Sequence, residues 1–158
     1  MKEMLWTPSK ERIRNANMTR FIEFVNQRYG KQFRSYDELY QWSIENIPDF
    51  WKCMWDFGQV KASRGYNIVV DDLGKMPGAR WFIGARLNFA ENLLRYGDDH
   101  VALIFKGEGC EATRMTYAKL YDSVARLSKS LRDMGVTKGD RVAGFMPNML
   151  ETVIAMLA

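Results

Sequence analysis

The sequence has few of the residues that metal sites and disulfides require. It contains two cysteines, Cys53 and Cys110, and one histidine, His100, among 158 residues. Neither cysteine has a second cysteine or a histidine at the spacing of a zinc site, so no metal site is expected. Such sparse use of cysteine is typical of a reducing compartment, in which both thiols stay free. We therefore expect a cytoplasmic protein with no metal-binding residues in this chain.

Long apolar runs are absent as well. No stretch approaches the roughly 20 consecutive apolar residues that a membrane-spanning helix needs. The N-terminal residues 1–8 (MKEMLWTP) have no apolar stretch of signal-peptide length behind them. Apolar residues make up 47% of the chain and charged residues 27%, which is the balance of a globular domain in water. We expect neither a leader sequence nor a membrane partner.

Positive charge is not concentrated in any one tract, although the net charge is +4. Residues 1–34 carry eight basic and three acidic side chains, whereas residues 35–60 carry one basic and five acidic side chains. The rest of the chain interleaves both signs, and no aromatic–glycine RNA-binding signature is present. A solvated mixed surface is therefore favoured over a nucleic-acid interface, and no nucleic-acid partner is expected.

The motifs of common nucleotide and hydrolase sites are also missing. There is no G-x-x-x-x-G-K-[ST] phosphate loop, no G-x-S-x-G elbow and no zinc-protease helix. Residues 107–112 (GEGCEA) fit the loose dinucleotide pattern G-x-G-x-x-A. That pattern receives a pyrophosphate only where it opens a helix, but here a second strand-like segment follows. A hairpin turn is the favoured interpretation.

The remaining candidates each have a structural interpretation that is favoured over a functional one. The acid pairs at 71–72 and 98–99 have no evident partner acid or base, which favours exposed turn residues. His100 could titrate near neutrality, but a lone histidine at the start of a strand favours a surface residue. Aromatic residues at helical spacing could form a ligand cage, but this spacing favours packing; they are Trp42, Phe50, Trp51, Trp55 and Phe57. We assign no catalytic, cofactor-binding or metal-binding residue in this chain.

The first sixty residues predict short helices rich in aromatic side chains. Thr7-Pro8 suits a helix N-cap followed by a first-turn proline. Residues 18–29 carry apolar side chains at helical spacing. Ser35 and Glu38 have the spacing of a capping box, which opens a further helix. A fourth helix is expected at about 49–57.

Residues 58–99 are rich in glycine and predict an irregular belt. Only 66–70 is expected to form a strand. One short helix is credible over about 89–96, opened by Asn88 and Glu91. Long irregular stretches usually cover another surface, so we expect this belt to lead from the helices to a larger body.

From His100 onward the pattern predicts an α/β fold. The expected elements are a strand at 101–105, a strand at 112–115, a helix from the Thr116 cap to about 134, a buried strand at 141–145 and a helix opened by Asn148-x-x-Glu151. The last helix carries no stop signal, and the parallel strand that would complete a β-α-β unit is missing. We expect that this sequence is cut from a longer α/β protein.

Several segments resemble acetoacetyl-CoA synthetases, which are acyl-adenylate-forming ligases. The resemblance is carried by LWTPS at 5–9, YQWS at 40–43, FWKCMWDF at 50–57 and MPGARWFIGARLNFAENLL at 76–94. Residues 138–143 (KGDRVA) and 146–148 (MPN) are shared broadly by such ligases. The resemblance extends over essentially the whole chain, although family members are several times longer.

The resemblance implies the N-terminal part of an ATP-dependent acetoacetate–CoA ligase. Residues 1–99 would be the helical cap and belt, and residues 100–158 the beginning of the AMP-binding core domain. The parent would convert acetoacetate, ATP and coenzyme A, with Mg²⁺, into acetoacetyl-CoA, AMP and diphosphate. All functional residues of the family lie beyond the position that matches Ala158. The chain alone is therefore expected to be inactive and to bind no cofactor, and nothing indicates its oligomeric state.

Two alternatives stay open at this point. The chain could come from a sister ligase for acetate or propionate, because the residues of the acyl pocket are expected further downstream. It could also be a stand-alone module whose aromatic helices bind a partner protein. An open sheet edge and an unfinished helix count against such a module, since both promote aggregation.

Overall fold

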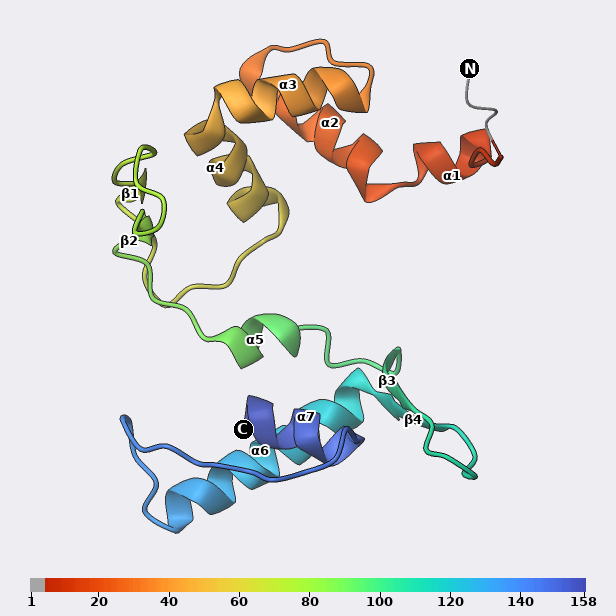
Figure 1. The fold of residues 1–158 in the computed structure, drawn as a ribbon, viewed down its shortest axis with the longest axis vertical. Helices are drawn as coiled ribbons and strands as arrows, with labels where there is room; N and C mark the ends of the chain where they lie inside the picture. Colours follow the sequence, from red (N-terminus) through yellow and green to blue (C-terminus); the bar gives the residue numbers. More distant parts are fainter. Residues whose placement is uncertain (1–4) are drawn as a thin grey trace. The chain divides into compact units, whose positions relative to one another are not determined.

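The computed structural model describes residues 5–158, and the chain divides into two compact units (Figure 1). The first unit ends at Arg86, and the second runs from Leu87 to Ala158. Helices predominate, and the strands form two separate two-stranded antiparallel sheets. The α/β fold class that the sequence predicts is confirmed.

Four helices begin the first unit: α1 (Lys10–Arg14), α2 (Asn17–Tyr29), α3 (Tyr36–Glu45) and α4 (Ile47–Phe57). The cap predicted at Thr7 is wrong, because the Ser9 hydroxyl accepts from the Arg12 amide at 3.2 Å and starts α1. The capping box of α3 is confirmed. The Ser35 hydroxyl accepts from the Glu38 amide at 3.3 Å, and the Glu38 carboxylate accepts from the Ser35 amide at 3.0 Å.

The core of the first unit lies between α2, α3 and α4. Its buried residues are Phe21, Val25, Leu39, Trp42 and Cys53. Further aromatic side chains, Phe24 and Phe57 among them, pack around this cluster. Because these apolar residues recur every three or four positions, each helix turns one face towards the others.

A short hairpin completes the first unit. Strands β1 (Ile68–Val70) and β2 (Trp81–Ile83) pair antiparallel, with Ile68 opposite Ile83 and Val70 opposite Trp81. The expected strand at 66–70 is present but shorter, and β2 was not expected. The part of the predicted belt that ends at Arg86 is therefore an ordered component of the first unit.

The second unit contains three helices and a hairpin. Its elements are α5 (Phe89–Leu93), β3 (Val101–Phe105), β4 (Thr113–Thr116), α6 (Tyr117–Asp133) and α7 (Leu150–Leu157). The predicted cap at Asn88 is confirmed, since its side-chain oxygen accepts from the Glu91 amide at 2.9 Å. The cap at Thr116 is confirmed in the same way by the Lys119 amide at 3.3 Å.

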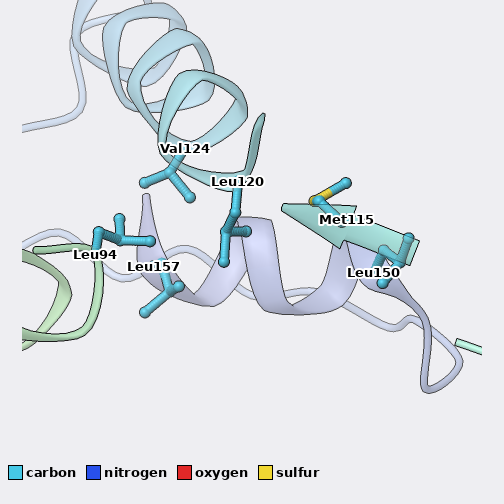
Figure 2. Packing of buried hydrophobic residues seen from close by; sticks show 6 residues of the cluster. All are labelled: Leu94, Met115, Leu120, Val124, Leu150 and Leu157. Carbon is cyan, nitrogen blue, oxygen red and sulfur yellow. The ribbon is translucent and has the colours of Figure 1, made fainter. Parts of the chain in front are cut away.

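The core of the second unit is small and consists of one cluster (Figure 2). Its buried side chains come from the segment after α5, from β4, from α6 and from α7; they are Leu94, Met115, Leu120, Val124, Leu150 and Leu157. Figure 2 shows Leu120 and Val124 of α6 directed towards α7. The unit is thus held together mainly by α6 and α7.

Two predictions for the C-terminal part are wrong. Residues 141–145 form no strand among the described residues, and their side chains are exposed rather than buried. A strand needs a hydrogen-bonding neighbour, and the described chain offers none at this position. Asn148 does not cap α7, which has Met149 at its N-cap and no side-chain cap. No helix within residues 5–158 is long and apolar enough to cross a membrane.

Candidate functional site

The glycine-containing segment 107–112 lies in the turn of the β3–β4 hairpin. Gly109 has a φ of +70°, a conformation that glycine adopts readily. A β-carbon placed at Gly109 would meet no atom within 4 Å, so the turn is open and forms no cradle around a ligand. Since strand β4 and not a helix follows, no row of helix amides faces the turn. The geometry agrees with a hairpin turn and not with a dinucleotide site.

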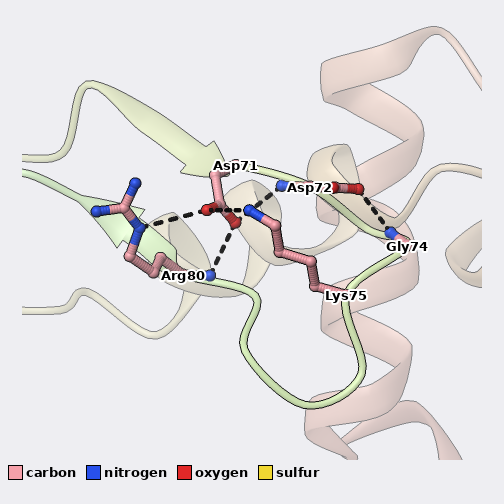
Figure 3. A network of polar contacts seen from close by, with 5 residues as sticks. All are labelled: Asp71, Asp72, Gly74, Lys75 and Arg80. Carbon is pink, nitrogen blue, oxygen red and sulfur yellow. Dashed lines mark hydrogen bonds and ion pairs between the residues drawn. The ribbon is translucent and has the colours of Figure 1, made fainter.

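Asp71 organises the loop that connects β1 and β2 (Figure 3). One of its carboxylate oxygens accepts from the Arg80 backbone amide at 2.9 Å. The other lies 3.2 Å from the Lys75 Nζ atom and 3.3 Å from the Arg80 Nε atom. Only 15% of the Asp71 side chain is exposed. The expectation of an exposed residue is therefore wrong for Asp71, whereas it holds for Asp72.

These contacts change the acidity of Asp71. The hydrogen bond from the Arg80 amide, together with the cations of Lys75 and Arg80, holds the pKa of the Asp71 carboxyl well below its usual range. A carboxylate with a lowered pKa stabilises the folded loop above about pH 4, and this stabilisation declines as the pH falls towards the folded pKa. The Asp71 oxygens also accept from the Asp72 amide at 2.8 Å, and all of these partners belong to the loop itself. The network therefore closes the loop, and none of its contacts points to a ligand.

We expect Asp71→Asn to open this loop. The amide side chain keeps one acceptor oxygen but loses the negative charge that holds Lys75 and Arg80. Trypsin should then cleave after these two residues severalfold faster at pH 7.5. In the unchanged chain, the hydrogen-exchange protection of the loop should decrease as the pH falls below about 4. In the variant this decrease should be smaller.

Asp72→Asn is the matched control for this experiment. The Asp72 side chain accepts from the Gly74 amide at 2.9 Å, which an asparagine can also do. Its cleavage rate should equal that of the unchanged chain. Equal cleavage of both variants would show that the Asp71 charge does not hold the loop.

The second acid pair and the histidine lie at the start of β3. Asp98 accepts from the His100 backbone amide at 3.1 Å, and its other oxygen lies 3.0 Å from the His100 Nδ1 atom. These contacts lower the pKa of the Asp98 carboxyl, with the His100 side chain as the largest cause. The His100 side chain is 85% exposed, as a surface residue would be. Asp98 and His100 thus form a turn at the surface, as expected from the sequence.

The aromatic residues singled out in the sequence pack against protein and do not enclose a cavity together. Trp42 contacts Tyr29 and Phe33, while Phe50 and Phe57 contact Phe21. Their rings are thus used by the core of the first unit. The geometry favours packing over a ligand cage.

Trp55 belongs to a separate group of three rings that attaches the hairpin to α4. Its ring centroid lies 4.7 Å from that of Phe82 and 5.1 Å from that of Tyr66. The ring centroids of Tyr66 and Phe82 are 5.2 Å apart. Phe82 has a φ of +47°, which is strained for a residue with a bulky side chain. The two ring contacts hold Phe82 in this conformation. Sequence patterns could not reveal this group, because Phe82 is an aromatic residue at a position where glycine or asparagine would be expected.

Partly exposed polar side chains lie near the buried Cys53 in the first unit. The Tyr29 hydroxyl donates to Asp49 at 3.0 Å, and Arg28 lies 2.6 Å from Asp56. Burial and the hydrogen bond to Asp49 raise the pKa of Tyr29 to about 12, and burial raises the pKa of the Cys53 thiol. A thiol with a raised pKa is a poor nucleophile at neutral pH, so these groups stabilise the helices and do not resemble a reactive site.

Two observations on the described residues concern metal ions and phosphate groups. Within residues 5–158, no group of three histidine, cysteine, aspartate or glutamate side chains could hold a metal ion. The glycine turn at 107–112 forms no phosphate cradle. Among the candidate site residues named from the sequence, Asp98 contacts His100, and Trp42, Phe50 and Phe57 share the core of the first unit. The expectation that this chain holds no catalytic or cofactor-binding residue stays a prediction.

Two protein-family models match consecutive parts of the chain. Residues 36–93 match the model described as acetyl-coenzyme A synthetase N-terminus. Residues 89–158 match the model described as AMP-binding enzyme. Together they extend from α3 to the end of the chain.

Similar proteins are known from bacteria, animals and fungi. The acetoacetyl-coenzyme A synthetase of Rhizobium meliloti (strain 1021) is 42% identical over 98% of this chain and 24% of its own length. The acetoacetyl-CoA synthetase of Xenopus tropicalis is 42% identical over 99% of this chain and 23% of its own length. A malonamoyl-CoA synthetase of Penicillium aethiopicum is 37% identical over 99% of this chain and 22% of its own length.

A solved structure resembles the fold of the chain closely. The acetoacetyl-CoA synthetase from Streptomyces lividans matches with a TM-score of 0.87 and 38% identity. The match covers 98% of this chain and 24% of that structure. The chain thus spans about a quarter of the length of the relatives that it matches.

Proposed function

Because the chain belongs to the acetoacetyl-CoA synthetase family, we propose that it is the N-terminal part of an ATP-dependent acetoacetate–CoA ligase. The observation that carries this proposal is the similarity to acetoacetyl-CoA synthetases along 98% of the chain, at 42% identity in sequence. The same similarity in the backbone of a solved relative supports it. The parent protein would join acetoacetate to coenzyme A and release AMP and diphosphate.

The proposed reaction needs an activated acyl group, because a carboxylate is a poor electrophile. An oxygen of the acetoacetate carboxylate would attack the α-phosphorus of ATP, and diphosphate would leave. The coenzyme A thiol, having lost its proton, would then attack the acyl carbon, and AMP would leave. ATP and coenzyme A are substrates of this reaction. Mg²⁺ is part of the proposal for the parent, but the described residues form no site that fits it, so no step here involves it.

We propose that residues 1–99 form the helical cap and belt of the ligase and that residues 100–158 begin its AMP-binding core domain. The two family matches, at 36–93 and 89–158, support this order of parts. The chain itself supplies packing surfaces, and the groups that contact the substrates would come from the remainder of the parent. We also propose a cytoplasmic location, since Cys53 and Cys110 are both free thiols.

The names of the relatives support a particular class of acid. An acetoacetyl group and a malonamoyl group both carry a second carbonyl separated from the thioester carbonyl by one methylene. Proteins with both names are similar to this chain. We therefore propose a short acid with a carbonyl at the third carbon as the substrate, with acetoacetate as the first candidate.

Diphosphate release tests the proposed activity. The complete parent protein, supplied with ATP, Mg²⁺ and acetoacetate, should release diphosphate, and with coenzyme A it should form one thioester for each AMP. The 158-residue chain in the same assay should give neither product. Thioester formation by the chain alone would contradict the assignment of the active site to the remainder of the parent, and no activity in the parent would contradict the ligase proposal.

A ligase for acetate or propionate is the second candidate. It is favoured by the family model of acetyl-coenzyme A synthetases, which matches residues 36–93. The two candidates differ in the size and polarity of the acyl pocket. They are therefore distinguished by the acid that the parent protein prefers, and not by any residue of this chain.

A further inference from the structure

A groove of about 650 Å³ lies in the first unit, between α1, α2 and the loop before α3. Helices α1 and α2 follow each other closely and are joined by residues 15–16 (Figure 1). The apolar side chains of the groove include Ile13, Met18 and Ile22, and the first two of these are about half exposed. Apolar side chains that line a hollow open to water favour the binding of an apolar group.

The uncharged polar side chains of the groove are largely used by the fold. The Asn26 side chain both donates to and accepts from the backbone of Phe33, at 2.9 Å in each case. The Thr19 hydroxyl donates to the Ile13 carbonyl, and the Ser35 hydroxyl caps α3. These groups are satisfied within the protein, so they do not determine what the groove binds.

Arg12 and Arg34 provide the positive charge of the groove. Neither side chain forms an ion pair with another described residue. The Arg12 guanidinium lies 5.7 Å from the centroid of the Trp6 ring. Glu38 attracts Arg34, but the Glu38 carboxylate accepts from two backbone amides. Guanidinium groups beside apolar side chains are suited to bind an anion that carries an apolar part.

The charge and the size of the groove indicate the kind of anion. Residues 5–34 carry seven basic and two acidic side chains. One of these acids, Glu23, lines the groove together with the two arginines, which leaves one positive charge. A single carboxylate would neutralise this charge. The volume of about 650 Å³ lies within the range of roughly 300–1,000 Å³ that is typical of small-molecule sites. One amphipathic molecule is therefore favoured over a membrane surface.

We propose that this groove binds a medium-chain carboxylate, with its apolar chain against Met18 and Ile22 and its carboxylate at Arg12 and Arg34. The arginines would donate charge-assisted hydrogen bonds, and the methylene groups of the ligand would leave water. No covalent step occurs at this site. The inference goes beyond the proposed function, because it uses residues of the first unit alone and requires no ligase reaction.

Calorimetry with dodecanoate, below its micelle concentration, tests the site in the 158-residue chain and in the complete parent protein. One molecule should bind to each protein. Octanoate should bind at least about tenfold more weakly, because four fewer methylene groups leave water. Dodecyltrimethylammonium has the same chain with a positive charge, and it should also bind at least about tenfold more weakly. Equal binding of the anion and the cation, or no binding of dodecanoate, would overturn the proposal. Binding to the chain but not to the parent would overturn it too.

A pair of substitutions tests the role of the arginines. Arg12→Gln combined with Arg34→Gln should weaken the binding of dodecanoate by at least about tenfold. Arg14→Gln combined with Arg20→Gln is the matched control. It removes the same number of charges from α1 and α2, but neither residue lines the groove. The control should change the affinity by less than about twofold. Equal weakening by both pairs would show a general attraction to this basic segment and would overturn the site.

A charge among the apolar side chains provides an independent test. Met18→Glu should abolish binding, because a carboxylate would lie where the ligand chain packs. Glutamate is tolerated in the first turn of a helix, so the unfolding curve in urea should stay unchanged. Ile44→Glu is the control at a similarly exposed residue of α3, outside the groove. Unchanged binding of dodecanoate by the Met18 variant would contradict the proposal.

The outcomes separate this site from the proposed function. Dodecanoate binding by a parent protein without ligase activity would support the groove and contradict the ligase. Activity without dodecanoate binding would support the ligase and contradict the groove. An amphipathic acidic peptide that binds where dodecanoate does not, and is lost from the Arg12 and Arg34 variant, would overturn the proposal in favour of a protein partner.

Discussion

Phe21→Ala is expected to lower the free energy of unfolding of the first unit by about 3–5 kcal/mol, as for other buried phenylalanines. Phe21 is only 4% exposed. Its ring lies 5.1 Å from that of Phe57 and 5.9 Å from that of Phe50, between α2 and α4. Alanine would leave a cavity where two helices meet, and the rings around it are too large to close it without moving those helices.

Tryptophan fluorescence during urea unfolding can measure this effect, because all five tryptophans lie within residues 1–86. The control is Tyr36→Ala in the same unit, at an exposed aromatic side chain. Its cost should be about 0.5 kcal/mol or less. Similar costs for the two variants would show that the Phe21 cluster is not the core of this unit.

Leu120→Ala should have the largest effect in the second unit, with a cost of about 2–5 kcal/mol. Leu120 is 3% exposed and lies in the cluster that joins α6 to α7 (Figure 2). This cluster has few buried members. The free energy of unfolding of such a small unit is therefore of the same order as the free energy that the substitution costs. The substitution is therefore expected to unfold most of the second unit in the 158-residue chain.

Hydrogen exchange of α6 can measure this loss, since the second unit contains no tryptophan. In the variant, the α6 amides should lose their protection, while those of α2 keep theirs. Leu87→Ala is the control, because the Leu87 side chain is half exposed and lies outside the cluster. It should leave α6 protected, and loss of protection in both variants would mean that the cluster does not explain the stability of the unit.

The parts of the fold that could be predicted from the sequence depend on neighbours a few residues apart. The capping box of Ser35 and Glu38 and the cap at Thr116 each join residues three positions apart, so spacing alone reveals them. Leu120 and Val124 are four positions apart, which is the spacing of one helix face, and both are buried in α6.

The parts that were missed depend on contacts between distant residues. Asp71 is held by Arg80, nine residues away, and no helical or strand period links the two. Strand β2 contains Phe82 in a left-handed conformation, which interrupts the alternation typical of strands. The segment 141–145 has the composition of a strand, but composition cannot supply the neighbouring strand that hydrogen bonding requires.

The candidate site shows the same limit. Sequence patterns correctly favoured a turn over a nucleotide loop at 107–112, because a strand follows the glycines. They did not reveal the ion-paired role of Asp71 or the ring contacts of Phe82. Neither feature points to a substrate, and both stabilise the hairpin of the first unit. The assignment to a ligase therefore comes from similarity along the whole chain and not from a constellation of reactive groups.

A competition between acids tests the central claim most directly. The complete parent protein would receive ATP, Mg²⁺, limiting coenzyme A and equal concentrations of acetoacetate, acetate and propionate, and mass spectrometry would identify the thioesters. We predict that acetoacetyl-CoA is the main product and that AMP forms in equal amount to total thioester. A product dominated by acetyl-CoA or propionyl-CoA, or no thioester at all, would contradict the assignment of this chain to an acetoacetate–CoA ligase.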